Sequence, residues 1–263
     1  MLKNYPFKGL SIITTCIIYF ASIFNSFSQN YSDITWYFGQ NGTALQFNKN
    51  DFEANKANNQ HAPLGNGGSA MAVDPITGNI LFYTDGVKIY DGSGAPISPG
   101  TLTLNGDPGS NQPAAISPIP GVEDNYFVFV NTGNGLTSTR IDMNQPGNAS
   151  NAGQPPLGAV IPPSVQNFFT GDINEAMLVI PGSSPDVFYL VVQETNGDYK
   201  VFTIDGLTIS APQTFSFPQG AAITAANFAY NPATNQIAVS PKGAGQDVQI
   251  LDFNPATGTL SFK

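Results

Sequence analysis

Aspartates at recurring positions are the residues of this chain whose type and spacing could do chemistry. Five of them stand where a short run of strand-forming residues ends: Asp85, Asp91, Asp142, Asp205 and Asp252. An aspartate at a turn can accept hydrogen bonds from nearby backbone N–H groups, and it can equally supply oxygen ligands to Ca²⁺. No D-x-D-x-D-G loop accompanies these residues. The sequence therefore favours turn capping, with calcium binding as the alternative and no other cofactor indicated.

Candidates for catalysis are few. His61 is the only histidine, and no G-x-S-x-G elbow offers it a serine, so we interpret it as a solvated loop residue. A glycosidase could instead use two of the carboxylates, but spacing along the chain does not establish the separation that such a pair requires. We therefore assign no catalytic residue and expect a protein that is not an enzyme. A carbohydrate-active enzyme with paired carboxylates is the alternative.

Residues 1–28 have the three parts of a secretory signal. Lys3 and Lys8 give a positive start, residues 10–24 are apolar, and small residues stand at the two positions that define cleavage, Ser26 and Ser28. The apolar run is shorter than the ~20 residues that span a bilayer. We expect cleavage before Gln29, export, and no membrane insertion afterwards. The only cysteine would leave with this segment, which excludes disulfides and thiolate metal sites from the mature chain.

The charge balance is acidic. Two of the nine basic residues lie in the signal, so seven basic residues face eighteen acidic ones in the mature chain, a formal charge of −11. Nucleic acids and anionic membrane surfaces both attract basic patches, so neither is an expected partner. Only 10% of the residues are charged, whereas glycine (27) and proline (21) are abundant. That composition is typical of many short strands joined by turns.

The aspartates belong to a repeat that residues 69–94 show in its clearest form. A five-residue turn, Asp74-Pro75-Ile76-Thr77-Gly78, separates two strand-like runs, and Asp85-Gly86 separates the second run from a third. The five-residue turn recurs at 231–235 and 254–258, and its fifth position requires left-handed backbone geometry, which glycine and asparagine tolerate best. The predicted turn residues are Asp74, Gly78, Asp85, Gly86, Asn231, Asn235, Asn254 and Gly258.

The repeat length predicts the fold. The aspartates at 91, 142, 205 and 252 are 51, 63 and 47 residues apart. These intervals match four-stranded β-propeller blades of the WD40 or YVTN type, which take ~40 to 50 residues each, with an insertion at 144–165 in the longest interval. No helical periodicity follows the signal, so residues 29–263 are predicted to be one all-β, propeller-like domain with four to five blades. The last residues look like the start of a fourth strand, and we expect the domain to be incomplete at its C-terminus.

Two further segments carry predictions. Residues 35–39 form an aromatic strand that could close the ring by pairing with the last repeat, and residues 48–68 are polar and predicted to be a loop. Aromatic residues at strand spacing favour packing between blades, with sugar stacking as the alternative. They are Tyr83, Tyr90, Tyr126, Phe127, Phe129, Phe188, Tyr189 and Phe228.

Several of these stretches together resemble a known family. They are Trp36-Tyr37-Phe38-Gly39, Leu81-Phe82-Tyr83-Thr84-Asp85-Gly86, Ile89-Tyr90-Asp91, Gly106, Gln112, Ala115-Ile116 and Tyr126-Phe127-Val128-Phe129. Their combination resembles the N-terminal propeller-like region of large secreted surface proteins of Bacteroidota. Family members often have tryptophan in place of Tyr90, and they continue into PKD or other immunoglobulin-like modules and a gliding-motility-associated sorting domain read by the type IX secretion system.

The resemblance implies a compartment and a kind of role. It implies an exported protein on the outer face of the outer membrane, with the further modules beyond Lys263 or, alternatively, a short relative without them. The function we expect is recognition or adhesion through loops at one end of the propeller. The expected partner is an extracellular polysaccharide or a surface protein. A passive spacer that presents other domains is a further alternative.

Overall fold

The computed structural model describes residues 35–38, 43–47, 53–58, 64–149, 151, 153–217, 225–242 and 247–263. The predicted signal sequence at 1–28 and His61 lie outside these residues. Every regular element within them is a β-strand, and no helix long and apolar enough to cross a membrane occurs among the residues searched.

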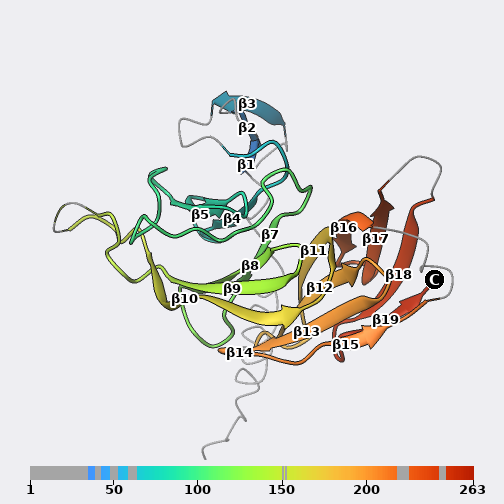
Figure 1. The fold of residues 1–263 in the computed structure, drawn as a ribbon. Helices are drawn as coiled ribbons and strands as arrows, with labels where there is room; N and C mark the ends of the chain where they lie inside the picture. The colour runs from blue at the N-terminus through green and yellow to red at the C-terminus, as the bar shows by residue number, and fades with distance from the viewer. Residues whose placement is uncertain are drawn as a thin grey trace, which may run out of the picture.

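Four antiparallel sheets follow one another along the chain and form the blades of a β-propeller arrangement (Figure 1). Blade 1 contains β4 (Ala70–Val73), β5 (Ile80–Thr84) and β6 (Ile89–Asp91). Blade 2 contains β7 (Ala114–Pro118), β8 (Asn125–Asn131), β9 (Gly135–Asp142) and β10 (Ala159–Thr170). Blade 3 contains β11 (Ile173–Pro181), β12 (Phe188–Glu194), β13 (Tyr199–Asp205), β14 (Thr208–Ile209) and β15 (Gln213–Phe215). Blade 4 contains β16 (Ala225–Asn231), β17 (Gln236–Pro241), β18 (Gln249–Asn254) and β19 (Thr259–Phe262).

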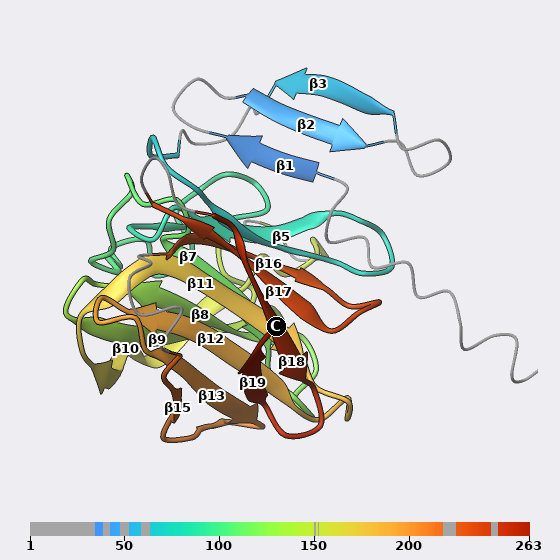
Figure 2. The same ribbon diagram turned by 90° about the vertical axis from the view of Figure 1, so that its right-hand side faces the viewer.

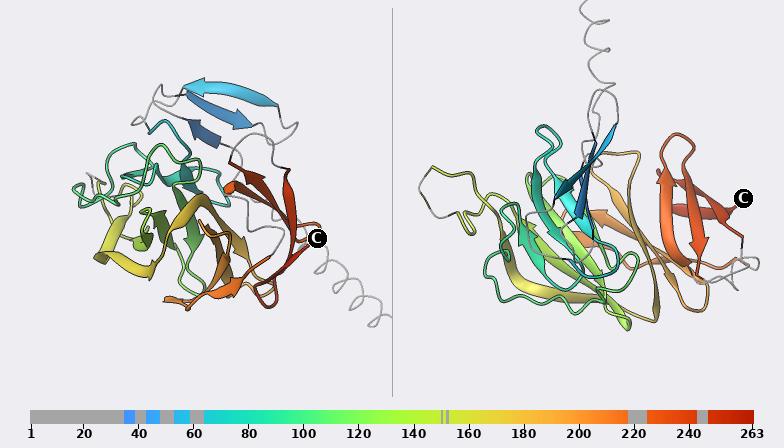
Figure 3. Two further views of the ribbon diagram at one scale, coloured as in Figure 1. Left: turned by 45° about the vertical axis from the view of Figure 1, so that its right-hand side comes forward. Right: turned by 90° about the horizontal axis from the view of Figure 1, so that it is seen from above.

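The first strand of each blade lies beside the first strand of the next, β4 by β7, β7 by β11 and β11 by β16. The blades are therefore arranged around a common centre, as the left view of Figure 3 shows. The all-β, propeller-like fold is confirmed. The predicted insertion at 144–165 needs a correction, because its last residues belong to β10, the outermost strand of blade 2.

A separate three-stranded sheet precedes the blades. It contains β1 (Thr35–Phe38), β2 (Thr43–Phe47) and β3 (Ala54–Asn58). In Figure 2 this sheet is at the top, above β5 of blade 1. β1 pairs with β2, and β19 pairs with β18, so the prediction that residues 35–39 pair with the last repeat is wrong. The prediction of a loop at 48–68 is also wrong in part, because β3 occupies residues 54–58. The ring of Tyr37 packs edge-on against Tyr83 of blade 1, with centroids 5.2 Å apart.

Strands in the middle of a blade are apolar on both faces because each face packs against a neighbouring blade. On β8, Val128 and Val130 belong to the core shared with blade 1, whereas Phe127 and Phe129 belong to the core shared with blade 3. Successive side chains of a strand point to opposite faces, so one strand serves both cores. Five of the eight aromatic residues predicted to pack between blades are buried, and the other three are half-buried.

The recurring turn has the geometry that its sequence requires. Oδ1 of Asp74 accepts hydrogen bonds from the backbone N–H groups of Ile76 and Thr77, at 2.7 and 3.1 Å. The fifth residue has a positive φ in all three copies, 75° at Gly78, 53° at Asn235 and 70° at Gly258. These turns lie at one end of the propeller, which we call the turn end. There the first strand of a blade connects to the second, and the third to the fourth.

The opposite end of the blades is joined by buried amide side chains. Asn131, at the end of β8, donates to the carbonyl oxygen of Asn174 at 2.7 Å. Asn174 in turn donates to Oε1 of Gln193 at 3.0 Å, and the same oxygen accepts the backbone N–H of Ala225 at 2.9 Å. The first and last of these bonds lead from the second strand of one blade to the first strand of the next, and the bond between Asn174 and Gln193 joins the first two strands of blade 3. This device holds blades 2, 3 and 4 in sequence.

Gln112 ties together the first strands of blades 3 and 4. Its Oε1 accepts the backbone N–H groups of Met177 and Phe228, at 3.3 and 2.8 Å, and its Nε2 donates to the carbonyl oxygen of Phe228 at 3.1 Å. One side chain just before blade 2 thus bonds to β11 and to β16. Gln112, which stands out in the sequence only as part of the family resemblance, therefore links the start of blade 2 to blades 3 and 4.

Candidate functional site

The repeated aspartates are occupied by local hydrogen bonds. Asp91 is fully buried; its Oδ1 accepts from the backbone and hydroxyl of Ser93 and from the backbone of Ala95, and its Oδ2 accepts from Nδ2 of Asn148. Asp85 caps the turn after β5 through the N–H groups of Val87 and Lys88. These are the capping bonds that the sequence favours.

The remaining candidates for calcium do not converge with them. Asp205 is exposed at the end of β13, and Asp252 accepts a hydrogen bond from Nε2 of Gln236. Asp252 also lies inside β18 rather than at its end, so Asn254 occupies the place that Asp205 has in blade 3. Asp85 lies at the opposite end of the propeller from the others. Among the described residues, no group of three or more histidine, cysteine or acidic side chains is placed to hold a metal ion.

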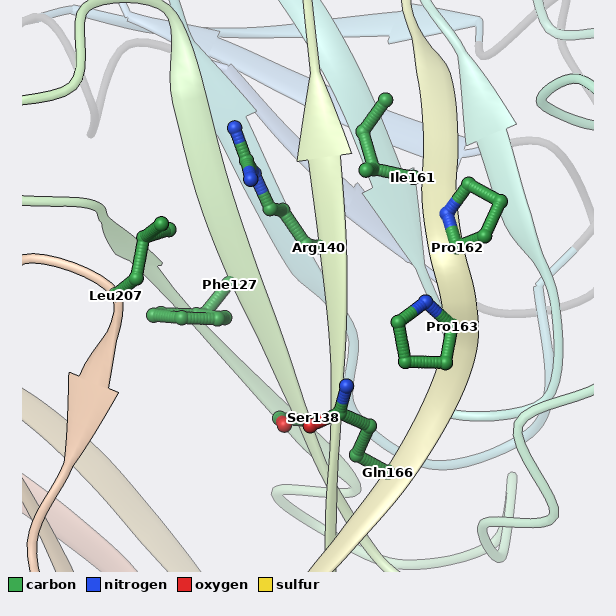
Figure 4. A pocket seen from close by; sticks show the side chains of 8 residues that line it. All are labelled: Phe127, Ser138, Arg140, Ile161, Pro162, Pro163, Gln166 and Leu207. Carbon is green, nitrogen blue, oxygen red and sulfur yellow. The ribbon is translucent and has the colours of Figure 1, made fainter.

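The most distinctive cavity lies between blades 2 and 3, on the outer part of the ring. We call it the Arg140 cleft; it has a volume of about 180 Å³ and is lined by Phe127, Ser138, Arg140, Ile161, Pro162, Pro163, Gln166 and Leu207. Figure 4 shows Ile161, the two prolines and Gln166 on β10, with Phe127 and Leu207 across the opening from them. A volume of this size is small for a cofactor and suits one compact group such as a single sugar ring.

Strand register explains which residues line the cleft. Phe127, Arg140 and Ile161 stand opposite one another on β8, β9 and β10, and Phe129, Ser138 and Gln166 form the next row. In each row the phenylalanine on β8 packs against blade 3 and the residue on β9 is polar, whereas the residue on β10 is Ile161 in one row and Gln166 in the other. The pairing of β10 with β9 shifts between Ile161 and Gln166, where Pro162 and Pro163 have no N–H to donate.

Arg140 is the only arginine of the chain and carries the positive charge of the cleft. Its Nε and Nη2 both donate to Oδ1 of Asn125, at 3.0 and 2.8 Å. Asn125 is buried, and its Nδ2 donates to the carbonyl of Glu123 and to Oδ1 of Asp142. Because Nδ2 faces these acceptors, the amide oxygen must face the arginine. The guanidinium is therefore held in place by a neutral partner.

Asp142 shares this network without forming an ion pair with Arg140. Burial alone would raise the pKa of Asp142, but hydrogen bonds from Gln145 and Asn144 and the positive charge of Arg140 outweigh it and lower the pKa. The carboxylate is thus ionised at neutral pH and bonded to several donors. It fixes Asn125 and does not fill the cleft.

A second, shallower depression of about 440 Å³ lies at the turn end of the same two blades. It is lined by residues 118–126 together with Pro185 and Phe188. Glu123 and Asp124 make this surface acidic. Asn125 belongs to the depression and also bonds to Arg140, so the two hollows are neighbours.

The sequence reasoning missed Arg140 as a site residue, although one signal was available. A single arginine in a chain with a net charge of −9, placed in a strand-like run, is unusual enough to mark a position. What the sequence could not show was that β10 bulges beside it, or that the turn of blade 3 carrying Leu207 closes the other side.

The comparisons with known proteins bear on the fold. No model of a known protein family matches this sequence, nor does any curated protein at a significant level. The periplasmic gluconolactonase of Pseudomonas aeruginosa matches with a TM-score of 0.50 and 12% identity, over 84% of this chain and 62% of that one. At that identity the likeness shows the propeller fold alone.

Two other solved structures are less similar. A Bacteroides uniformis protein provisionally assigned as a 6-phosphogluconolactonase has a TM-score of 0.47 and 14% identity, over 86% of this chain and 65% of that one. A lectin from Aleuria aurantia, solved with the disaccharide Fucα1-6GlcNAc, has a TM-score of 0.41 and 12% identity, over 89% of this chain and 79% of that one. The chain spans less than two thirds of the length of both lactonase-type structures.

Proposed function

We propose that this protein is an exported recognition module of the cell surface that binds a glycan and does not turn it over. The observation that carries the proposal is the Arg140 cleft, where a positioned cation and two polar side chains face an apolar wall. Such a mixture of one oriented charged group with apolar lining is typical of small-ligand sites. The cleft lies on the outer face between blades, so the proposed contact surface differs from the propeller-end loops predicted from sequence.

The state of the carboxylates supports binding over catalysis. A glycosidase needs two carboxylates facing the same substrate bond. Asp91 and Asp142 are each engaged by several donors, and the lining of the cleft includes no carboxylate. The alternative from another class is a hydrolase acting on a carbohydrate or a lactone. A protein partner at the cell surface is the other recognition alternative.

The test is a pair of assays on the purified protein. Binding to a glycan array is measured for the wild type and for Arg140→Ala, and hydrolysis of gluconolactone and of chromogenic glycosides is measured in parallel. We expect glycan binding that the substitution removes, and no hydrolysis above background. Hydrolysis that a single Asp or Glu substitution abolishes would replace the proposal with the enzyme alternative. An array without any signal would also contradict it.

A further inference from the structure

We infer that the Arg140 cleft selects a sugar that bears a carboxylate, and that Arg140 binds this carboxylate with two parallel hydrogen bonds. The inference rests on the proposed function and goes beyond it, because it names the ligand chemistry and the group that recognises it. It begins from the way in which the guanidinium is held.

A guanidinium has five N–H donors in a fixed plane. Asn125 takes the donors of one edge, Nε and one N–H of Nη2. The other edge, formed by Nη1 and the second N–H of Nη2, makes no hydrogen bond to any residue that the structure describes. Two parallel donors on one edge match the two oxygens of a carboxylate. The side chain is thus positioned, and its free edge has the geometry for bidentate binding.

Arg140 also forms no direct ion pair with a described residue, and Asp142 acts on its charge only from beyond ion-pair distance. The ion pairs found among the described residues join Lys200 to Glu194 and Lys242 to Glu175, and none of these four residues lines the cleft. A partly buried cation held by a neutral amide gains more from an anionic ligand than one already paired with a carboxylate. Asn125 therefore acts as a positioning residue that leaves the charge available.

The walls of the cleft favour a sugar over the carboxyl end of a peptide. Peptides that lie along a sheet use the free N–H groups of its edge strand. β10 is the outermost strand of blade 2, but at the cleft it carries Pro162 and Pro163, which have no N–H. Their exposed rings instead offer apolar surface to the C–H face of a pyranose, and the buried Phe127 lines the cleft from blade 2's second strand. Ser138 and Gln166 can bond to its hydroxyl groups.

The neighbouring depression limits how many carboxylates the ligand carries. Glu123 and Asp124 line it, and they would repel a second carboxylate placed beside the one bound by Arg140. The structure therefore fits a glycan in which acidic sugars are separated by neutral ones better than a polymer of acidic sugars alone.

A matched pair of ligands tests the inference on the unmodified protein. Methyl β-glucuronide and methyl β-glucoside differ only at C6, which is a carboxylate in the first and a hydroxymethyl group in the second. Their dissociation constants can be measured by NMR titration. We expect the glucuronide to bind at least about tenfold more tightly, because hydrogen bonds to a charged group are strong, and to weaken as salt is added. A short peptide with a free carboxyl terminus, tested alongside, should bind no better than the glucoside.

Variants test the role of Arg140 itself. Arg140→Gln should reduce glucuronide affinity to that of the glucoside, and Arg140→Lys should retain only part of it, since lysine keeps the charge without the planar pair of donors. Lys242→Gln is the matched control, because it removes one positive charge from an exposed site on blade 4 and should change affinity by less than about twofold. Melting temperatures of all variants are compared with the wild type.

The outcomes separate this inference from the proposed function. Equal binding of glucuronide and glucoside, or glucuronide binding that survives Arg140→Gln, would overturn the carboxylate inference while leaving glycan recognition in place. Preference for the peptide would overturn it in favour of a protein partner. Absence of binding to any sugar, here and on the array, would overturn both.

Discussion

The interface between blades 2 and 3 has a packed apolar part and an open part that forms the Arg140 cleft. On the second strands, Phe129 of blade 2 and Leu190 and Val192 of blade 3 are buried together in one core. One strand farther out in blade 2, Ser138 stands opposite Phe129 and Arg140 stands opposite Phe127. Apolar side chains thus give way to polar ones at these two positions of β9, and one of the two is the only arginine of the chain. Substitutions in the packed part should therefore change stability, and substitutions in the Arg140 cleft should change binding with little effect on stability.

The largest effect on stability is expected where the interface is fully packed. Phe202→Ala removes a fully buried ring that packs edge-on against Phe168 and Phe169, with centroids 5.3 and 5.4 Å away. The lost burial and the cavity left behind should lower the free energy of unfolding by ~3 to 5 kcal/mol, measured by denaturant titration. Leu207→Ala, in the Arg140 cleft, should change it by less than about 0.5 kcal/mol because Leu207 is 56% exposed. Equal losses would erase the distinction between the two parts.

A smaller loss is expected where polar groups join the blades. Asn131→Ala removes the two bonds that Nδ2 of this buried side chain donates from blade 2 to the carbonyl oxygens of Ile173 and Asn174 in blade 3. Leaving buried polar groups unsatisfied should cost ~1 to 3 kcal/mol in the same titration. An unchanged midpoint would show that the amides between blades are incidental.

Turn geometry predicts a comparable loss at the turn end. Gly78→Val forces a β-branched residue to a φ of 75°, which should cost ~1 to 3 kcal/mol and lower the melting temperature. Ile76→Val in the same turn is the control, since Ile76 is 82% exposed and should have almost no effect. If both variants melt like the wild type, the turn assignment is wrong.

The smallest effect concerns pH. Burial raises the pKa of Tyr199 to about 12, from 10.0, so the unfolded state releases this proton first as pH rises. Stability associated with Tyr199 is therefore complete below about pH 10 and is lost progressively towards pH 12. Tyr199→Phe should be close to wild type at pH 7 and should lose less stability between pH 10 and 12. A parallel decline of both proteins would contradict this assignment.

The sequence predicted the parts of the fold that depend on local chemistry. The five-residue turns at 74–78, 231–235 and 254–258 could be identified from their residue types. Each begins with aspartate or asparagine and ends with glycine or asparagine, and these residues are typical of turns. The repeat spacing then gave the blades. The strand at 54–58 was not predicted, because its alanine, asparagine and lysine residues have low strand propensity and pair with β2 through tertiary context.

The candidate site could not be predicted in the same way. Arg140, Gln166 and Leu207 come from three different strands or turns, and they meet only because β10 bulges and blade 3 stacks on blade 2. Of the recurring aspartates, Asp85, Asp91 and Asp142 cap turns through backbone N–H groups. The repeated sequence motifs form the turns and blades of the propeller. The proposed site depends instead on residues that are not part of the repeat.

The most direct measurement is a crystal structure of the protein with a glucuronide-containing oligosaccharide. We predict that the carboxylate lies in the Arg140 cleft, bonded to Nη1 and Nη2 of Arg140, with Asn125 still bonded to the opposite edge and the sugar ring against Pro162 and Pro163. The ligand bound at an end of the propeller, with the Arg140 cleft empty, would contradict the account.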